Sequence, residues 1–367
     1  MNLPIFLIAI STLSTVSFLL NYLLLKWTRT LGTKNQGEDV QVRWSETHKP
    51  AIGGVSFYII FLISYLTYLF LAKPEVEAQQ STTQFAILIS VTLGFFTGLA
   101  DDAFNTVPWL KFSAQLSCGV LLVLFGIQIE FFNIPWADAM LTVFWTVSVM
   151  NSINMLDNMD GVTGSVTICI LAAAGLCAFP ITDSNLFFTF ICGGTMAAVF
   201  GFLFFNWHPS KMFMGDTGSQ MLGALLASIG ITFFWNNSSL VPDHSWISKL
   251  IVVSTAFVVP IADSLTVTIN RIARGQSPFV GGRDHTTHHL SYAGLSDEKV
   301  AFIMAVLSAI SVLLIGLLKF IPESELKAYM LVMGLFSFLV IVFLYSTTLW
   351  KKPRSTFRSR NLNHVKT

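Results

Sequence analysis

Apolar runs of about 20 residues, the length that an α-helix needs to cross a bilayer, recur along almost the whole chain. Short polar links separate them. The first run has neither a basic leading region nor a small-residue cleavage site, so we interpret it as a membrane helix and not as a signal peptide. The pattern predicts about eleven membrane spans, at roughly 3–25, 52–72, 83–100, 109–126, 138–154, 162–180, 186–205, 217–235, 248–270, 298–321 and 327–350.

The composition is that of a membrane protein. Only 11% of the 367 residues are charged, against roughly 25% in soluble domains. We therefore expect an all-α integral membrane protein, with residues 1–350 forming a single polytopic domain and 351–367 a basic tail that contacts anionic membrane lipids. A net charge of +1 gives no reason to expect nucleic acid as a partner.

The basic residues predict the orientation of the chain. Of the 21 Lys and Arg residues, 17 lie at the odd-numbered links or in the C-terminal tail, and four lie on the opposite side. Cytoplasmic loops carry the basic excess in membrane proteins. The N-terminus should therefore lie outside, and the odd-numbered links and the C-terminus should be cytoplasmic.

Five polar clusters occupy these same odd-numbered links, which predicts one composite active site formed by cytoplasmic loops. A transporter would instead tend to place ionisable residues near the middle of the bilayer, often in two related halves, and we find no internal repeat. The clusters are His48 to Gly54, Asp101-Asp102, Asn151 to Asp160, Asn206 to Ser219 and Asp263 to His289.

Asp101 and Asp102 end the third apolar run. Two adjacent carboxylates repel each other, and the C-terminal end of a helix also disfavours negative charge. A bound metal, a lysine such as Lys111 or a raised pKa would compensate. The alternative is a solvated helix terminus with no further role.

Asn151, Asn154, Asp157 and Asp160 follow one another at intervals of three residues where the fifth run ends. They would line one face if the helix continued. Amide and carboxylate oxygens on that face could bind a hard cation such as magnesium. The alternative is a polar helix cap.

The turn from Phe213 to Ser219 precedes the eighth run. Asp216 is well placed as a metal ligand, because magnesium takes one or two protein carboxylates and leaves its other positions to water and phosphates. Phe213 could stack on a nucleobase. Taken alone, the turn could also be a Gly-rich loop with a helix cap.

A histidine-rich segment lies in the ninth link, where Arg283, His285, His288 and His289 are close in sequence. Arginine offers a rigid fork of donors to phosphate and histidine can donate as well, which favours phosphate binding. Zinc ligation is the first alternative, although nothing marks the fixed carboxylate and supporting partners that a catalytic zinc site would need. A solvated cytoplasmic loop is the second.

Taken in order, these motifs resemble the polyprenyl-phosphate N-acetylhexosamine-1-phosphate transferases, relatives of the phospho-N-acetylmuramoyl-pentapeptide translocases. The resemblance runs from about Lys49 to Leu295. It implies transfer of an N-acetylhexosamine-1-phosphate, with GlcNAc-1-phosphate as the first expectation, from a UDP-sugar to undecaprenyl phosphate. UMP would be released, and the reaction would initiate a cell-envelope polysaccharide such as O-antigen at the cytoplasmic face of a bacterial inner membrane.

The resemblance also implies roles for single residues. It suggests Mg²⁺, with Mn²⁺ as an alternative, and leaves a homodimer open. The expected catalytic residues are Asp101, Asp102 and Asp157; the metal site is Asn154 with Asp216; nucleoside contacts are Asp160 and Phe213; the lipid-phosphate partner is Lys111; and the sugar diphosphate is held by Arg283, His285, His288 and His289.

Three alternatives stay open. The same chemistry could use another donor, either UDP-MurNAc-pentapeptide or a modified amino sugar, or the chain could transport a lipid-linked sugar. The sequence departs from the family pattern at two places, of which the second bears on the choice of sugar. Asn158 stands where the family usually has Gly, and two threonines separate His285 from His288 where many members have one residue.

Overall fold

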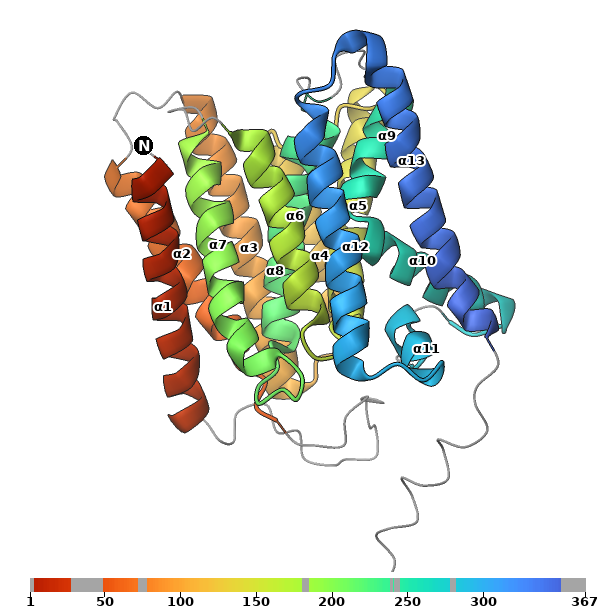
Figure 1. Cartoon of the computed structure of the whole chain (residues 1–367). Coiled ribbons are helices and arrows are strands. Elements are labelled where there is room, and N and C mark those ends of the chain that lie inside the picture. The colour runs from red at the N-terminus through yellow and green to blue at the C-terminus, as the bar shows by residue number, and fades with distance from the viewer. Residues whose placement is uncertain are drawn as a thin grey trace, which may run out of the picture.

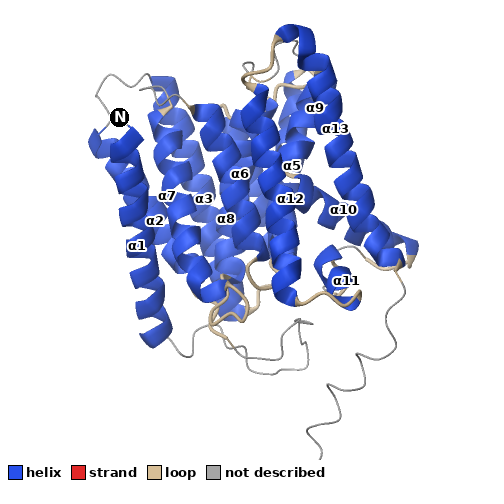
Figure 2. Cartoon of the chain, in the orientation of Figure 1, coloured by secondary structure: helices blue, strands red, loops and turns tan. Residues whose placement is uncertain are grey.

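The computed structural model describes residues 3–27, 49–71, 78–179, 185–237, 240, 245–277 and 282–350. Within these ranges the chain is helical, and the only β-type pairing is an isolated parallel bridge between Ala51 and Phe213 (Figure 2). The helices are α1 (Leu3–Trp27), α2 (Gly53–Leu71), α3 (Ala78–Phe104), α4 (Pro108–Leu124), α5 (Pro135–Leu156), α6 (Val162–Ala178), α7 (Leu186–Asn206), α8 (Gly215–Gly230) with a π-helical end η1 (Ile231–Trp235), α9 (Trp246–Ala256), α10 (Val258–Ala273), α11 (Thr286–Tyr292), α12 (Asp297–Leu318), α13 (Glu323–Ser346) and the 3₁₀ turn η2 (Thr347–Leu349).

Every predicted apolar run contains a helix, which confirms an all-helical protein with several membrane spans. Among the described residues, eight helices are long and apolar enough to cross a membrane, and the bent pair α9 and α10 would make a ninth. The helices α4 and α6 are apolar but shorter, at 17 residues each. A total of eleven crossings therefore stays a prediction.

The expectation of one continuous span at 248–270 is wrong. The helix α9 ends at Ala256, α10 begins at Val258, and their axes differ by 89°. Pro260 lies three residues into α10, where its ring would clash with the carbonyl of residue 256 in a continuous helix. Figure 1 shows the result, with α10 running across the bundle towards the lower end of α13.

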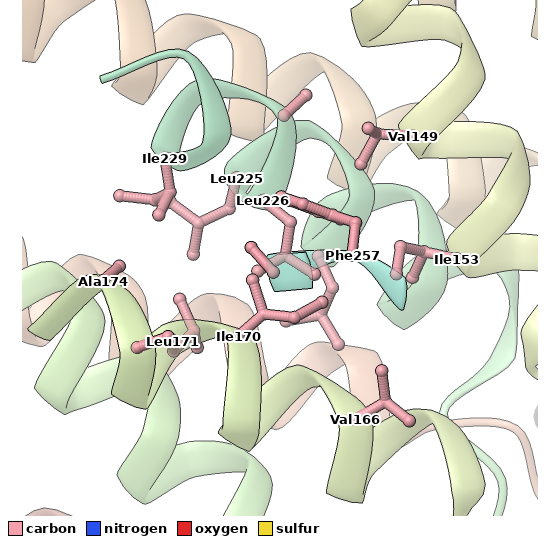
Figure 3. Packing of buried hydrophobic residues seen from close by; sticks show 14 of the residues in the cluster. Val149, Ile153, Val166, Ile170, Leu171, Ala174, Leu225, Leu226, Ile229 and Phe257 are labelled. Carbon is pink, nitrogen blue, oxygen red and sulfur yellow. The ribbon is translucent and has the colours of Figure 1, made fainter. Parts of the chain in front are cut away.

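The helix α8 forms the centre of the bundle. In the span Gly215–Trp235, 94% of the residues in the apolar stretch that identifies it as a span are buried, against 11% for the corresponding stretch of the peripheral helix α1. Many of the α8 residues are Gly, Ala or Ser, and such small side chains let neighbouring helices approach closely in a membrane. Figure 3 shows Leu225 and Leu226 of α8 facing residues of α5 and α6 and the ring of Phe257.

The predicted polar clusters that the structure describes lie at one end of the bundle. In Figure 1, α1 starts at the upper end, whereas the end of α3, the start of α8 and the whole of α11 lie at the lower end. This arrangement agrees with polar links that share one side, although which side is cytoplasmic stays a prediction. His48 and the predicted basic tail 351–367 lie outside the described residues.

Gly98 allows α3 to pack directly on the first turn of α8. A Cβ atom at this position would overlap the carbonyl group of Asp216, which is backbone and cannot rotate away. Gly175 in α6 is a useful contrast, since no atom lies within 4 Å of a Cβ built there.

We expect Gly98→Ala to destabilise the protein by roughly 1–3 kcal/mol, the usual cost of overpacking a close helix contact. The matched variant Gly175→Ala should be neutral or stabilising, because alanine favours a helix over glycine and meets no neighbour. Thermal unfolding of both variants in detergent would measure the difference. Equal melting temperatures would show that α3 and α8 do not pack as described.

Candidate active site

Asp102, at the end of α3, holds the first turn of α8. Its carboxylate accepts hydrogen bonds from the backbone N–H of Asp216 at 3.1 Å, from the N–H of Thr217 at 2.9 Å and from the Thr217 hydroxyl at 2.7 Å. The N-terminus of a helix carries partial positive charge and unpaired N–H groups, so this carboxylate is stabilised there. For this pair of acids the sequence suggested a metal, Lys111 or a raised pKa as compensation; Lys111 lies 3.6 Å from Asp101, whereas the N-terminus of α8 as the partner of Asp102 was not predicted.

Lys111 of α4 lies among oxygen atoms from three other helices. Its Nζ is 3.0 Å from Oδ2 of Asp216, 3.3 Å from Oδ1 of Asn154 and 3.6 Å from Oδ2 of Asp101. The amide of Asn154 also donates to Asp216 at 2.8 Å. We call Lys111, Asn154 and Asp216 the ion layer, and the point where Lys111 Nζ lies the cation position.

The cation position suits a hard metal ion. Its neighbours are carboxylate and amide oxygens, which are the ligands that magnesium prefers. The side chains of Lys111 and Asp216 keep 18% and 20% of their surface exposed, so a ligand can reach them, whereas Asp101 keeps 7%. No group of three or more His, Cys, Asp or Glu residues among the described ranges could hold a metal, so a bound Mg²⁺ would depend on phosphate or water for its remaining positions.

Asp157 follows the last residue of α5 and faces several other acids. Burial of its carboxyl group, followed by repulsion from Asp216, Asp102 and Asp160, raises the pKa of Asp157 to about 8. At neutral pH the group is therefore mostly protonated. A strongly raised pKa at a cluster of acids is typical of functional sites, which agrees with the predicted catalytic role.

Asp160 belongs to a neighbouring polar corner. Its carboxylate accepts hydrogen bonds from the backbone N–H of Ser210 at 3.0 Å and from the Ser210 hydroxyl at 2.7 Å, and it lies 3.1 Å from Nδ1 of His208. Lys49 donates to the Ser210 hydroxyl at 2.9 Å, and its Nζ lies 5.1 Å from the centre of the Phe213 ring. The two predicted nucleoside contacts, Asp160 and Phe213, therefore lie in one corner with a cation between them.

The segment before α2 pairs with the turn before α8. The N–H of Phe213 donates to the Pro50 carbonyl, and the N–H groups of Gly53 and Gly54 donate to the carbonyls of Phe213 and Met214, all at 3.0 Å. These backbone bonds join the first and fourth predicted motifs. They explain how Lys49, far away in sequence, reaches the corner of Asp160.

Asp263 of α10 organises the start of α11. It accepts hydrogen bonds from the N–H and hydroxyl of Thr286 at 2.8 and 2.7 Å, and it lies 2.8 Å from Nδ1 of His285. All three residues are buried. The predicted substrate-binding role of His285 stays a prediction, but one side of its ring is already held by a carboxylate, which fixes the orientation of the imidazole.

A bidentate pair between Arg271 and Asp284 fixes the segment before α11. Arg271 donates to both oxygens of Asp284, at 3.0 and 2.7 Å, and Arg274 adds a contact at 3.3 Å. Despite the opposing effect of burial, the hydrogen bonds and charges of these arginines lower the pKa of Asp284 below its usual value. The exposed Arg283 beside it lies on the surface, where a phosphate group can reach it.

The helix α11 docks on the end of α5 through Asn158. The Thr287 hydroxyl donates to Oδ1 of Asn158 at 2.6 Å, and the ring of His288 contacts the Asn158 backbone. Burial, and to a smaller extent the charge of His285, lowers the pKa of His288 to about 3. His288 is therefore neutral at pH 7, so it can contribute a hydrogen bond but no charge to a phosphate. His289, the last histidine of the segment, has a ring that packs edge-on against Tyr292.

The structure brings the predicted site residues to one end of the bundle, in three adjoining groups. The first is the ion layer with the acids around it, the second is the Asp160 corner, and the third is the α11 segment. Our reading of single residues missed Asp263, Arg271 and Thr287, which hold that segment. The one sequence signal that pointed to them was a carboxylate, Asp263, inside an apolar run. The structure buries this side chain completely.

Comparison with known proteins assigns the middle of the chain to a family. Residues 84–234 match the model described as glycosyl transferase family 4. This match, together with the curated relatives, confirms the family resemblance that the sequence motifs predicted. The matched region runs from α3 to η1 and contains the ion layer, the acids around it and the Asp160 corner, but it leaves out Lys49 and α11.

Curated proteins similar to this chain carry two kinds of name. The "Probable undecaprenyl-phosphate N-acetylglucosaminyl 1-phosphate transferase" of Bacillus subtilis is 28% identical over 271 residues, which are 70% of this chain and 71% of that protein. A "Decaprenyl-phosphate N-acetylglucosaminephosphotransferase" of Mycobacterium leprae is 27% identical over 70% of both chains. A "Phospho-N-acetylmuramoyl-pentapeptide-transferase" of Listeria welshimeri is 26% identical over 73% of this chain and 83% of that protein.

We expect Asp102→Asn to destabilise this protein by about 1–3 kcal/mol, because the amide cannot accept all three hydrogen bonds from the start of α8. The matched variant Asp101→Asn should cost less, since it keeps an oxygen for the Thr106 hydroxyl. Thermal unfolding without substrate separates the two carboxylates, which an activity assay does not. A larger loss for Asp101→Asn would contradict the structural role of Asp102.

We expect Thr287→Val to loosen α11, because it removes the hydroxyl that bonds Asn158 and keeps the size of the side chain. Hydrogen–deuterium exchange of residues 286–292 should become about fivefold faster, which corresponds to a net hydrogen bond of about 1 kcal/mol. Thr287→Ser keeps the hydroxyl and should exchange at the wild-type rate. Unchanged exchange in Thr287→Val would show that another contact holds the helix.

Proposed function

We propose that this protein transfers an N-acetylhexosamine-1-phosphate, with GlcNAc-1-phosphate as the leading candidate, from a UDP-sugar to undecaprenyl phosphate or a related polyprenyl phosphate. UMP is the second product. The reaction takes place at the cytoplasmic face of a bacterial inner membrane and initiates a cell-envelope polysaccharide.

The single observation that supports this proposal most strongly is the cation position. Oxygen atoms from α3, α5 and α8 surround one point that Lys111 reaches from α4, at the end of the bundle where the polar links gather. A lipid phosphate at the membrane surface and a water-soluble nucleotide can both reach such a site. The names of the curated relatives, which all describe transfer of a sugar phosphate group, agree with it.

The proposed reaction joins two anions. An oxygen of the lipid phosphate attacks the β-phosphorus of the UDP-sugar, a new P–O bond forms, and the bond between the β-phosphorus and the bridging oxygen breaks to release UMP. A phosphate monoester has a second pKa near 6, so the lipid phosphate is mostly dianionic at neutral pH and needs no strong base. Catalysis therefore depends on neutralising charge and on positioning.

Different residues of the site would neutralise charge and position the substrates. Asp216 and Asn154 would hold Mg²⁺, which neutralises the diphosphate and supplies electrostatic stabilisation when it is bound. Lys111 can move its ammonium group from the carboxylates to the lipid phosphate, and the exposed Arg283 can bind the sugar diphosphate. Protonation of Asp157 removes one negative charge from the place where the anions meet.

The donor sugar divides the proposal into two candidates. The names of two relatives specify N-acetylglucosamine, and that of the third specifies N-acetylmuramoyl-pentapeptide. We favour GlcNAc because the Bacillus subtilis protein combines 28% identity with coverage of 70% of this chain, whereas the two muramoyl-pentapeptide transferases of equal identity cover 55% of it. The muramoyl-pentapeptide donor and modified amino sugars are the alternatives that an assay must include.

The decisive measurement is UMP release by purified protein in detergent, with magnesium, undecaprenyl phosphate and a panel of UDP-sugars that includes UDP-GlcNAc and UDP-MurNAc-pentapeptide. We expect release that needs both the lipid and one donor. Asp216→Ala should lower the rate by roughly 10²-fold or more, because it removes a charged group that fixes the phosphates.

Thr255→Val is a suitable control for this assay, since Thr255 makes a buried hydrogen bond to Ser337 between α9 and α13, away from the ion layer. It should keep the wild-type rate. Release with UDP-MurNAc-pentapeptide alone would identify that compound as the donor and leave the proposed reaction unchanged. No release with any donor, from protein that remains folded, would contradict the proposed function.

A further inference from the structure

Three amide side chains meet within the bundle behind the ion layer. Gln115 lies on α4, Asn151 on α5 and Gln220 on α8. The Nε2 group of Gln115 donates to Oδ1 of Asn151 at 3.2 Å and to Oε1 of Gln220 at 3.1 Å. Asn151 donates in return to Oε1 of Gln115 at 3.0 Å. We call these three residues the amide layer.

The amide layer repeats the ion layer one helical turn deeper. In an α-helix, residues three or four positions apart lie on the same face, one above the other. Each residue of one layer therefore stands directly behind a residue of the other, on the same helix. The pairs are Lys111 with Gln115, Asn154 with Asn151, and Asp216 with Gln220.

Burial makes the amide layer sensitive to the spacing of its helices. Gln115 and Gln220 are 1% and 0% exposed. Unpaired amides are costly in a membrane interior, so the hydrogen bonds oppose any sliding or rotation of α4 and α8. Next to the amide layer the same three helices also contribute to a small apolar cluster of Cys118, Met150 and Ala224, so the amide layer borders an apolar core.

We propose that the amide layer is a positioning element that fixes α4, α5 and α8 relative to one another and thereby holds the oxygens of Asn154 and Asp216 at the cation position. This inference rests on the proposed function for its kinetic consequences only. Its geometric claim can be tested without substrate, by measuring the affinity of the ion layer for a divalent cation.

The role is positioning and not direct catalysis. The amide layer lies behind the ion layer, and its described hydrogen bonds are to one another and, for Asn151, also to the Val147 carbonyl. Its effect must therefore pass through the helices. Displacement of a reacting group by about 1 Å can lower a rate by roughly 10²-fold, so a small change in helix spacing is enough.

Gln115→Met and Gln220→Met test the proposal, because methionine has a similar length and no hydrogen-bonding amide. Gln220→Met is the milder variant, since its side chain takes part in a single described hydrogen bond, the one from Gln115, and its Nε2 has no partner in the described part of the chain. Thr146→Val and Ser228→Ala are matched controls on α5 and α8. Both residues are buried, and their hydroxyls bond only within their own helix.

The first measurement is Mn²⁺ binding by electron paramagnetic resonance, on detergent-purified protein with neither lipid nor nucleotide. The second is UMP release, and thermal unfolding checks that each variant is folded. We expect both Gln variants to bind Mn²⁺ about tenfold more weakly and to lower kcat by roughly tenfold to 10²-fold. The double variant should resemble Gln115→Met alone, because Gln115→Met already removes the described bond of Gln220.

Wild-type Mn²⁺ affinity and kcat in folded Gln220→Met would overturn the proposal, as would equal losses in the two controls or the absence of saturable Mn²⁺ binding to the wild type. Failure of the proposed function gives a different result. In that case no donor yields UMP with the wild type, while Mn²⁺ binding still weakens in the Gln variants and supports the positioning role.

Discussion

The close packing of α3 against the first turn of α8 is the constraint on which the rest of the site depends. Gly98 leaves room for the α8 backbone, and Gly215 starts α8 with a φ of +73° at a place where a Cβ atom would overlap the carboxylate of Asp102. Only glycine adopts this conformation without strain while also leaving that space. Asp102 then binds the N–H groups at the start of α8, which fixes Asp216 beside Asp101, close enough for a side-chain hydrogen bond between the two acids and for repulsion when both are ionised.

The distribution of counter-charges follows from this repulsion. Most of the acids at this end of the bundle have a basic partner in the described part of the chain, and Asp157 differs because its burial, followed by the acids around it, raises its pKa. The protein therefore holds Asp157 by protonation, Asp102 by the N–H groups of α8 and the remaining acids by pairing, a combination that leaves the centre of the site acidic enough to attract a divalent cation. The pairs are Asp101 and Asp216 with Lys111, Asp160 with Lys49, Asp263 with His285, and Asp284 with Arg271.

The sequence predicted the parts of this structure that depend on local pattern. The length of the apolar runs located the helices, and the polar clusters at the ends of these runs indicated the candidate site, because both follow from the cost of placing polar groups in a bilayer. The break between α9 and α10 was missed although Pro260 was visible, since a proline within a membrane helix is often accommodated by its neighbours. The partners of Asp102 and Asn158 were also missed. These contacts join residues more than 100 positions apart, at 114 and 115 for Asp102 and 129 for Asn158, and no local pattern encodes them.

The neutral state of His288 changes how the histidine-rich segment can act on an anionic substrate. A buried imidazole with a pKa of about 3 carries no charge at pH 7, so a cluster of histidines does not by itself make a positive site. In the proposed function, the positive charge available to a diphosphate near α11 would come instead from the exposed Arg283, while Asp263 orients His285 and Asn158 holds α11 in place. In this arrangement the segment works as a rigid support for one exposed arginine. Its position relative to Asp157 is set by the docking of α11 on the end of α5, because Asn158 is the next residue in the chain.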